Sequence, residues 1–138
     1  MQKKVHKLKD IYPEEFRVVA IAAHQSDYRL SWALNQKLGW ELQRSDDLEL
    51  ANKSGDKQHF PTYVYQGPGN QSFYLVANKS QTGFLFPSMT NIDFLLKAVD
   101  ATAEDVDLII RKIRQIDFVI TAFRLENMKQ SDKKKLTF

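Results

Sequence analysis

The stretch that decides the fold lies at residues 17–23, Arg17-Val18-Val19-Ala20-Ile21-Ala22-Ala23. After Arg17 it is continuously apolar and rich in β-branched residues, which is typical of a strand buried on both faces of a sheet. Ser26 then offers a helix N-cap, and Gly39 offers a C-terminal stop. Between them leucines recur every four residues, at Leu30, Leu34 and Leu38. The sequence therefore predicts a buried strand that leads into a one-faced helix over residues 26–38.

The middle of the chain has the composition of short strands. Alternating or β-branched and aromatic residues predict these strands at residues 40–43, 62–65, 72–77 and 84–86. The cluster Gln66-Gly67-Pro68-Gly69-Asn70 predicts a hairpin turn, and Pro87 is expected to end the last strand. Residues 44–57 are mostly polar, so we expect the strand before them to continue into an exposed loop.

The second half of the chain predicts another strand, helix and strand. Residues 92–99 fit the period of a strand and that of a helix. We interpret them as a strand, because a clear helix follows. Thr102 is its N-cap and Asp105 completes a capping box, and the apolar stripe comprises Val106, Ile109, Ile110 and Ile113. Residues 118–125 predict the final strand.

This order of elements predicts an α+β fold with two layers. The pattern is β-α-β, a strand meander and a second β-α-β, which gives a largely antiparallel sheet with two helices on one face and a ferredoxin-like character. The hairpin strands are apolar on both faces, since Tyr63 and Tyr65 share one face and Val64 lies on the other. We therefore expect the second face to be buried in a homodimer, with cover by residues 44–57 as the alternative.

Positive charge is concentrated at the two ends of the chain. The 138 residues predict one domain, residues 11–128, between a basic N-terminal tail, residues 1–10, and a basic C-terminal tail, residues 129–138. The two tails carry a net charge of +6, and the body between them a net charge of −3. Nucleic-acid binders concentrate positive charge on a folded face. The charge distribution therefore argues against a nucleic-acid partner. In the second tail, Leu136 and Phe138 have the apolar character needed to dock.

Composition excludes several classes of protein. The sequence contains no cysteine, which excludes disulfides, thiolate nucleophiles, iron–sulfur clusters and cysteine zinc sites. It begins without the apolar stretch of a secretory signal, and no apolar run approaches the ~20 residues that span a membrane. We therefore expect a cytoplasmic protein without a membrane partner.

Two stretches carry a family resemblance. One is Asp27-Tyr28-Arg29-Leu30-Ser31-Trp32-Ala33-Leu34-Asn35, and the other is Phe86-Pro87-Ser88-Met89-Thr90-Asn91-Ile92-Asp93-Phe94. They resemble the IPExxxVDY proteins, a bacterial family named for its motif. Pro87 and Asp93 keep the motif's positions, whereas Phe86 and Ser88 replace its Ile and Glu. The resemblance implies a compact single-domain cytoplasmic protein, and it carries over no catalytic residues because the family has no assigned biochemical function.

Histidines and acidic residues are the candidates for metal binding or catalysis in this sequence. None of the three histidines has a second histidine or a carboxylate at metal-ligand spacing, so we expect no metal and no cofactor. Asp46, Asp47 and Glu49 offer oxygen ligands, but adjacent residues of a strand point to opposite faces, which favours a solvated acidic edge. His24 ends the buried strand three residues before Asp27. A ligand-binding or catalytic role for His24 and a structural hydrogen bond to the backbone or to Asp27 both fit that position.

The candidate binding residues are His24, Asp27, Arg29, Trp32 and Asp93. Trp32 and Tyr28 lie off the leucine stripe of the first helix, where they mark a partner surface or wrap the sheet edge. The sequence favours a non-enzymatic binding or protein-interaction module. A small-molecule-sensing regulatory domain is the alternative, by fold-level analogy with amino-acid-binding domains. An enzyme that uses His24 with Asp27 or Asp93 is a third hypothesis, and it requires His24, Asp93 and Arg29 to line one cleft.

Overall fold

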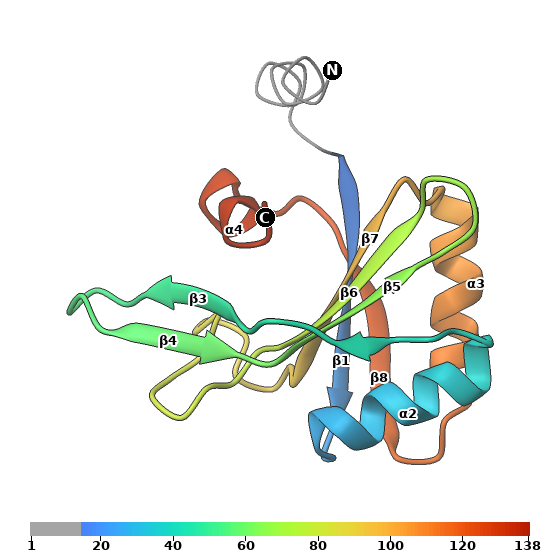
Figure 1. Ribbon diagram of the computed structural model, residues 1–138, viewed down its shortest axis with the longest axis horizontal. Helices are drawn as coiled ribbons and strands as arrows, with labels where there is room; N and C mark the ends of the chain where they lie inside the picture. Colours follow the sequence, from blue (N-terminus) through green and yellow to red (C-terminus); the bar gives the residue numbers. More distant parts are fainter. Residues whose placement is uncertain (1–14) are drawn as a thin grey trace.

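The computed structural model describes residues 15–138, so the predicted N-terminal tail lies outside the described residues. In chain order (Figure 1) the elements are β1 (Phe16–Ala23), α2 (Asp27–Leu38), β2 (Gln43–Arg44), β3 (Leu48–Ala51), β4 (Lys57–Phe60), β5 (Thr62–Gln66), β6 (Ser72–Ala77), β7 (Phe94–Val99), α3 (Ala103–Ile113), β8 (Val119–Leu125) and α4 (Gln130–Lys135).

Six strands form one sheet in the order β2-β5-β6-β7-β1-β8, and every neighbouring pair is antiparallel. Strand β1 lies between β7 and β8, with Val19 opposite Leu96 on one side and Ile21 opposite Ala122 on the other. The unit β7-α3-β8 is therefore a split β-α-β unit that encloses β1. Strands β3 and β4 form a separate two-stranded ribbon. The predicted α+β class with a largely antiparallel sheet is confirmed.

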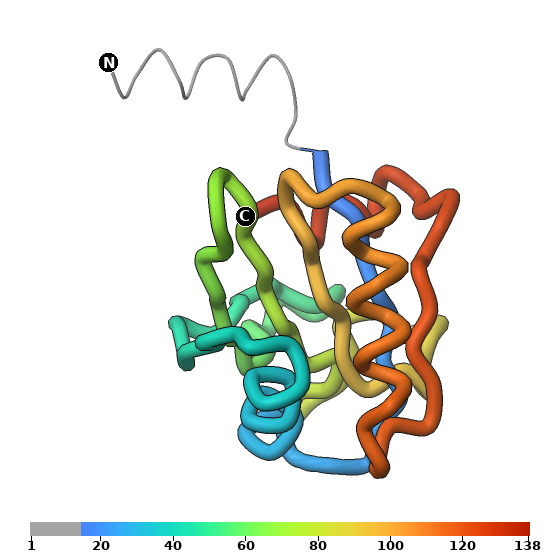
Figure 2. The backbone as a smooth tube through the Cα atoms, turned by 90° about the vertical axis from the view of Figure 1, so that its right-hand side faces the viewer, coloured from blue at the N-terminus to red at the C-terminus, as the bar shows by residue number. Residues whose placement is uncertain are grey.

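Helices α2 and α3 cover one face of the sheet, as Figure 2 shows from the side on which they lie. The first buried cluster joins Leu30 and Leu34 of α2 and Ile113 of α3 to strand residues such as Ile21. Both helices begin at the predicted caps: the backbone N–H of Arg29 donates to Ser26 Oγ at 3.1 Å, and Thr102 and Asp105 form a capping box. The prediction of two helices on one face is confirmed.

The other face of the sheet is covered by the chain itself. There the ribbon β3-β4, the loop of residues 78–93 and the C-terminal segment pack on the sheet (Figure 1). The second buried cluster consists of Val18, Ala20, Phe60, Val76, Leu85, Phe86, Ile92, Leu95 and Leu136. The second face is therefore buried within the chain, and Leu48 and Leu50 of residues 44–57, the predicted alternative cover, pack against this cluster. Loop residues and Leu136 supply further cover that strand and helix periodicity does not reveal, and the homodimer stays a prediction.

Two predicted strands differ in the structure. Of residues 40–43, only Gln43 belongs to β2. The side chain of Asn35 forms hydrogen bonds with both backbone groups of Leu42, which are then not available for strand pairing. The N–H of Leu42 donates to Asn35 Oδ1 at 2.8 Å, and Asn35 Nδ2 donates to Leu42 O at 3.3 Å. Residues 84–86 form no strand but a single bridge between Phe84 and Lys79. Their backbone is bound by Asn78 instead, so Leu85 and Phe86 can turn into the second cluster.

The polar stretch and the C-terminal segment are more ordered than expected. Residues 44–57 contain β3, which turns back into β4, rather than one exposed loop. The segment of residues 129–138 is not a solvated tail, since it forms α4 and buries Leu136 completely. Phe138 packs edge-on against Tyr74, and the centroid of its ring lies 4.2 Å from Nζ of the buried Lys97. The apolar residues therefore outweigh the lysines in placing this segment.

Candidate functional site

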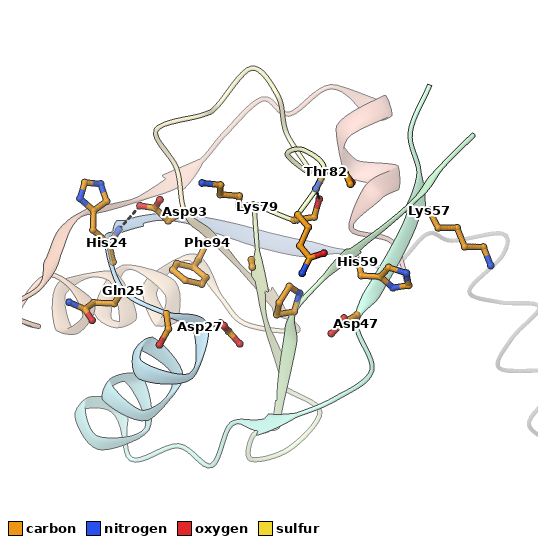
Figure 3. Close-up of a pocket in the computed structure, with 16 residues that line it drawn as sticks. His24, Gln25, Asp27, Asp47, Lys57, His59, Lys79, Thr82, Asp93 and Phe94 are labelled. Atoms are coloured by element: carbon orange, nitrogen blue, oxygen red, sulfur yellow. Dashed lines mark hydrogen bonds between the residues drawn. The ribbon is translucent and has the colours of Figure 1, made fainter. Parts of the chain in front are cut away.

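An open cleft of about 920 Å³ lies at the end of β1, where α2 begins (Figure 3). Its walls come from the β1–α2 turn, the segment between β2 and β3, strand β4, and both ends of the loop of residues 78–93. Most of the lining side chains are polar or charged, and Phe94, Ala77 and Pro61 provide an apolar base. The cleft therefore combines segments that are far apart in the sequence.

The β1–α2 turn is fixed by Asp93, which precedes β7. Asp93 Oδ2 accepts a 2.8 Å hydrogen bond from the backbone N–H of Ala23, the last residue of β1 (Figure 3). His24 follows at once with an exposed imidazole, so it is presented to solvent at the rim of the cleft. Asp93 thus holds the turn that carries His24, and one of its oxygens is already occupied.

Asp27 is oriented by a buried tyrosine of β5. The hydroxyl of Tyr63 donates a 2.8 Å hydrogen bond to Asp27 Oδ2. Burial, and after it this hydrogen bond to Asp27, raises the pKa of Tyr63 to about 12. Tyr63 therefore remains a donor over the physiological range, and it fixes the Asp27 carboxylate while the second carboxylate oxygen can accept from another group.

Asp47 is oriented by Arg44 of β2. Arg44 Nη2 lies 2.5 Å from Asp47 Oδ1, and the guanidinium carbon lies 5.6 Å from the centroid of the Tyr63 ring. The hydrogen bond to Asp47 raises the pKa of Arg44. Arg44 and Tyr63 therefore connect the two carboxylates of Asp47 and Asp27. Within residues 15–138, no group of three or more histidine or acidic side chains is arranged to hold a metal ion.

The opposite side of the cleft is built by the loop of residues 78–93. Its base is Asn78, which is fully buried. Asn78 Oδ1 accepts from the N–H of Phe86 at 2.8 Å, and Nδ2 donates to Met89 O at 3.0 Å and to Ile92 O at 2.8 Å. This framework presents Lys79, which Figure 3 shows on the side of the cleft opposite Asp27 and Asp47.

Strand β4 contributes His59 and Lys57, and both side chains are exposed. Lys57 Nζ lies 3.7 Å from Glu49 Oε1 of the neighbouring strand β3, in a solvent-exposed ion pair. In Figure 3 the Lys57 amine points away from the other labelled residues. Lys79, which is also exposed, is the other cation of the lining, and the structure shows no ion pair for it among the described residues.

The structure brings together three of the five predicted binding residues. His24, Asp27 and Asp93 line the cleft, whereas Arg29 and Trp32 do not. The Arg29 guanidinium lies 5.9 Å from the centroid of the Phe118 ring, and Trp32 is 57% exposed on the outer side of α2. The enzyme hypothesis required His24, Asp93 and Arg29 in one cleft, and only the first two meet there.

Sequence reasoning missed the residues that other segments bring to the cleft, namely Asp47, His59, Tyr63, Asn78 and Lys79. No local pattern marks them, because each belongs to a segment far from β1 in the sequence that reaches the cleft region only in the folded chain. Asp47 was grouped with Asp46 and Glu49, although its partner is Arg44.

No protein-family model matches this chain, and the search of curated proteins finds no significant relative. Across the described residues 15–138, no helix has the length and apolar character needed to cross a bilayer.

Proposed function

We propose that this chain is a binding domain whose cleft takes a small zwitterionic ligand, one that carries both an ammonium group and an acidic group, as free amino acids and dipeptides do. The observation that supports it is the arrangement of charge in the cleft, with Asp27 and Asp47 on one side and Lys79, together with Asp93, on the other (Figure 3). The cleft's volume of about 920 Å³ lies within the roughly 300–1,000 Å³ of small-molecule sites.

The two carboxylates suit an ammonium group. Tyr63 occupies one oxygen of Asp27, and Arg44 occupies one oxygen of Asp47. The other oxygen of each carboxylate can accept hydrogen bonds from a ligand. An ammonium group supplies three donors, which such free carboxylate oxygens can accept. Because Tyr63 and Arg44 already restrict these side chains, binding costs less side-chain entropy. Lys79, with the hydroxyl of Thr82 nearby on the same loop, complements the acidic group of the ligand.

An enzyme that uses His24 receives less support. Asp93 already accepts from the N–H of Ala23, and Asp27 already accepts from Tyr63. Among the described residues, His24 makes no hydrogen bond to either carboxylate, so neither one orients its imidazole. The remaining proposals, a cytoplasmic location and membership of the IPExxxVDY family, would be tested by localisation of the tagged protein and by the structure of a family member.

Isothermal titration with a panel of free amino acids and dipeptides tests the ligand class. For the best ligand, we expect the N-acetylated and the decarboxylated analogues to bind at least about tenfold more weakly, because each loses one charged contact. Asp47→Asn and Lys79→Met should weaken binding similarly. The matched controls are Asp56→Asn and Lys53→Met, two exposed residues of the β3–β4 turn outside the cleft lining. Absence of binding across the panel, or equal affinity of the blocked analogues, would overturn the proposal.

A protein-interaction module, self-association included, is the second candidate. Tyr28 and Trp32 are 71% and 57% exposed on one side of α2, and aromatic side chains of this kind are enriched at interfaces. Sedimentation of the wild type and of Trp32→Ala over a range of concentrations tests it. A dimer that Trp32→Ala weakens would support this surface, and a single 16.0 kDa species at all concentrations would refute self-association.

A further inference from the structure

The C-terminal segment contacts the middle of the loop whose ends line the cleft. Lys135 Nζ donates a 2.6 Å hydrogen bond to the carbonyl oxygen of Leu85, and it lies 5.3 Å from the centroid of the Phe86 ring. Leu136 is fully buried in the same cluster as Leu85 and Phe86. The helix α4 is therefore attached to residues 78–93 by a polar and an apolar contact.

Hydrogen bonds connect the middle of that loop to both of its ends. Leu85 and Phe86 are bound at their backbone to Asn78, through the N–H of Leu85 to Asn78 O at 2.8 Å and the N–H of Phe86 to Asn78 Oδ1 at 2.8 Å. Asn78 immediately precedes Lys79, and its own N–H donates to Asp93 O at 2.9 Å. A shift of Leu85 and Phe86 therefore strains the anchor that positions both cleft-lining ends of the loop.

Helix α4 has little stability of its own. It spans only six residues, buries none of them, and has no side-chain cap at Lys129. Isolated helices this short are unstable in water. Its position depends instead on its last residue, Lys135, and on Leu136 and Phe138, which follow it. The centroid of the Phe138 ring lies 4.2 Å from Lys97 Nζ. A segment with so few anchors opens locally at lower free energy than the sheet does.

We propose that α4 is a detachable latch that regulates the cleft. Docked α4 holds the loop of residues 78–93 where its ends form the cleft wall, and release of α4 loosens that wall. This inference rests on the proposed binding role of the cleft. Because coupling between two sites is reciprocal, a ligand that holds Lys79 and its neighbours also favours docked α4.

Hydrogen–deuterium exchange of the full chain tests the latch without any ligand. Lys135→Met removes the hydrogen bond to Leu85 but keeps an apolar side chain beside Phe86, and Leu136→Ala removes the buried anchor. In both variants we expect the amides of Leu85 and Phe86 and those of α4 to exchange about tenfold faster or more, since both report one opening. Peptides of β1 and α3 should keep the wild-type rates. The control is Lys134→Met, at the exposed neighbouring position.

Faster exchange in α4 alone, with wild-type rates at Leu85 and Phe86, would overturn the latch. If Leu136→Ala also raises exchange in β1 and α3, the whole fold opens, and the milder Lys135→Met variant decides by the same criterion. The ligand from the titration panel should bind Lys135→Met about tenfold more weakly, and unchanged affinity would overturn the regulatory role. If nothing in the panel binds, the ligand proposal fails while the exchange data still judge the latch.

Discussion

The hydroxyl of Tyr63 donates a 2.8 Å hydrogen bond to Asp27 Oδ2, and so connects the hairpin strand β5 to the first residue of α2. The two residues are distant in the sequence, and their contact places one carboxylate of the cleft. Because Tyr63 is buried, the contact also affects how stability depends on pH.

Stability should fall at alkaline pH through Tyr63. Burial and the bond to Asp27 raise the pKa of Tyr63 from 10.0 to about 12, so the folded state favours the protonated phenol. The resulting stabilisation is fully present below pH 10 and is lost as pH rises towards 12. Urea unfolding of the wild type and of Tyr63→Phe at a series of pH values checks this. The variant should lose less stability over that range, and an equal loss in both proteins would contradict the prediction.

The helix layer should depend on its buried isoleucines. Ile113→Ala is expected to lower the free energy of unfolding by about 2–5 kcal/mol, because the side chain is fully buried in the first cluster. Leu108 on the same helix is 46% exposed, and Leu108→Ala should cost well under half as much. Chemical denaturation measures both. Similar losses at the two positions would mean that α3 does not face the sheet as described.

Asn78 should be among the most sensitive polar residues of the chain. Asn78→Ala removes three side-chain hydrogen bonds, to Phe86, Met89 and Ile92, and leaves buried backbone groups without them. We expect a loss of about 2–4 kcal/mol in the free energy of unfolding. Asn70→Ala, in the exposed hairpin turn, is the matched control and should change it little. A loss below about 1 kcal/mol at Asn78 would show that solvent replaces these bonds.

The capping box of α3 should contribute measurably. Thr102→Ala is expected to cost about 0.5–2 kcal/mol, because the N–H of Asp105 loses its acceptor, Thr102 Oγ1. Thr102→Ser keeps the hydroxyl and should retain most of the stability. Thermal unfolding of the two variants separates the role of the hydroxyl from that of the methyl group, and equal losses would assign the effect to the methyl group.

Local signals predicted the elements whose patterns are complete within a few residues. The apolar run of β1, the caps Ser26 and Thr102, and the turn between β5 and β6 all appear in the structure where the sequence indicated them. Of the ambiguous residues 92–99, Phe94–Val99 form β7, because they pair with β1 on one side and with β6 on the other.

Features that depend on distant side chains could not be predicted in this way. Asn35 shortens β2 through bonds to Leu42 that no strand pattern reveals. The apolar character of Leu136 predicts that it can dock, but its docking site is formed by Leu85 and Phe86. These residues are distant in the sequence, as the separation of 50 residues between Leu85 and the neighbouring Lys135 shows. His24, Asp27 and Asp93 lie directly beside β1, α2 and β7, elements that the sequence predicts. Lys79 belongs instead to a loop without regular structure, which no sequence pattern marks.

The position of β1 between β7 and β8 has a consequence for synthesis of the chain. β1 is translated before every other strand of its sheet, whereas its two partners, β7 and β8, are the last two strands of that sheet to be translated. Its apolar residues therefore stay unpaired while the segments from α2 to β6 are translated, and helix α2, the next element along the chain, is a neighbour that can form early. Such non-local pairing slows folding and prolongs exposure of a strand that other nascent chains can join. We expect the sheet to form only after β7 and β8 have been translated, and fragments that end before β7 to aggregate.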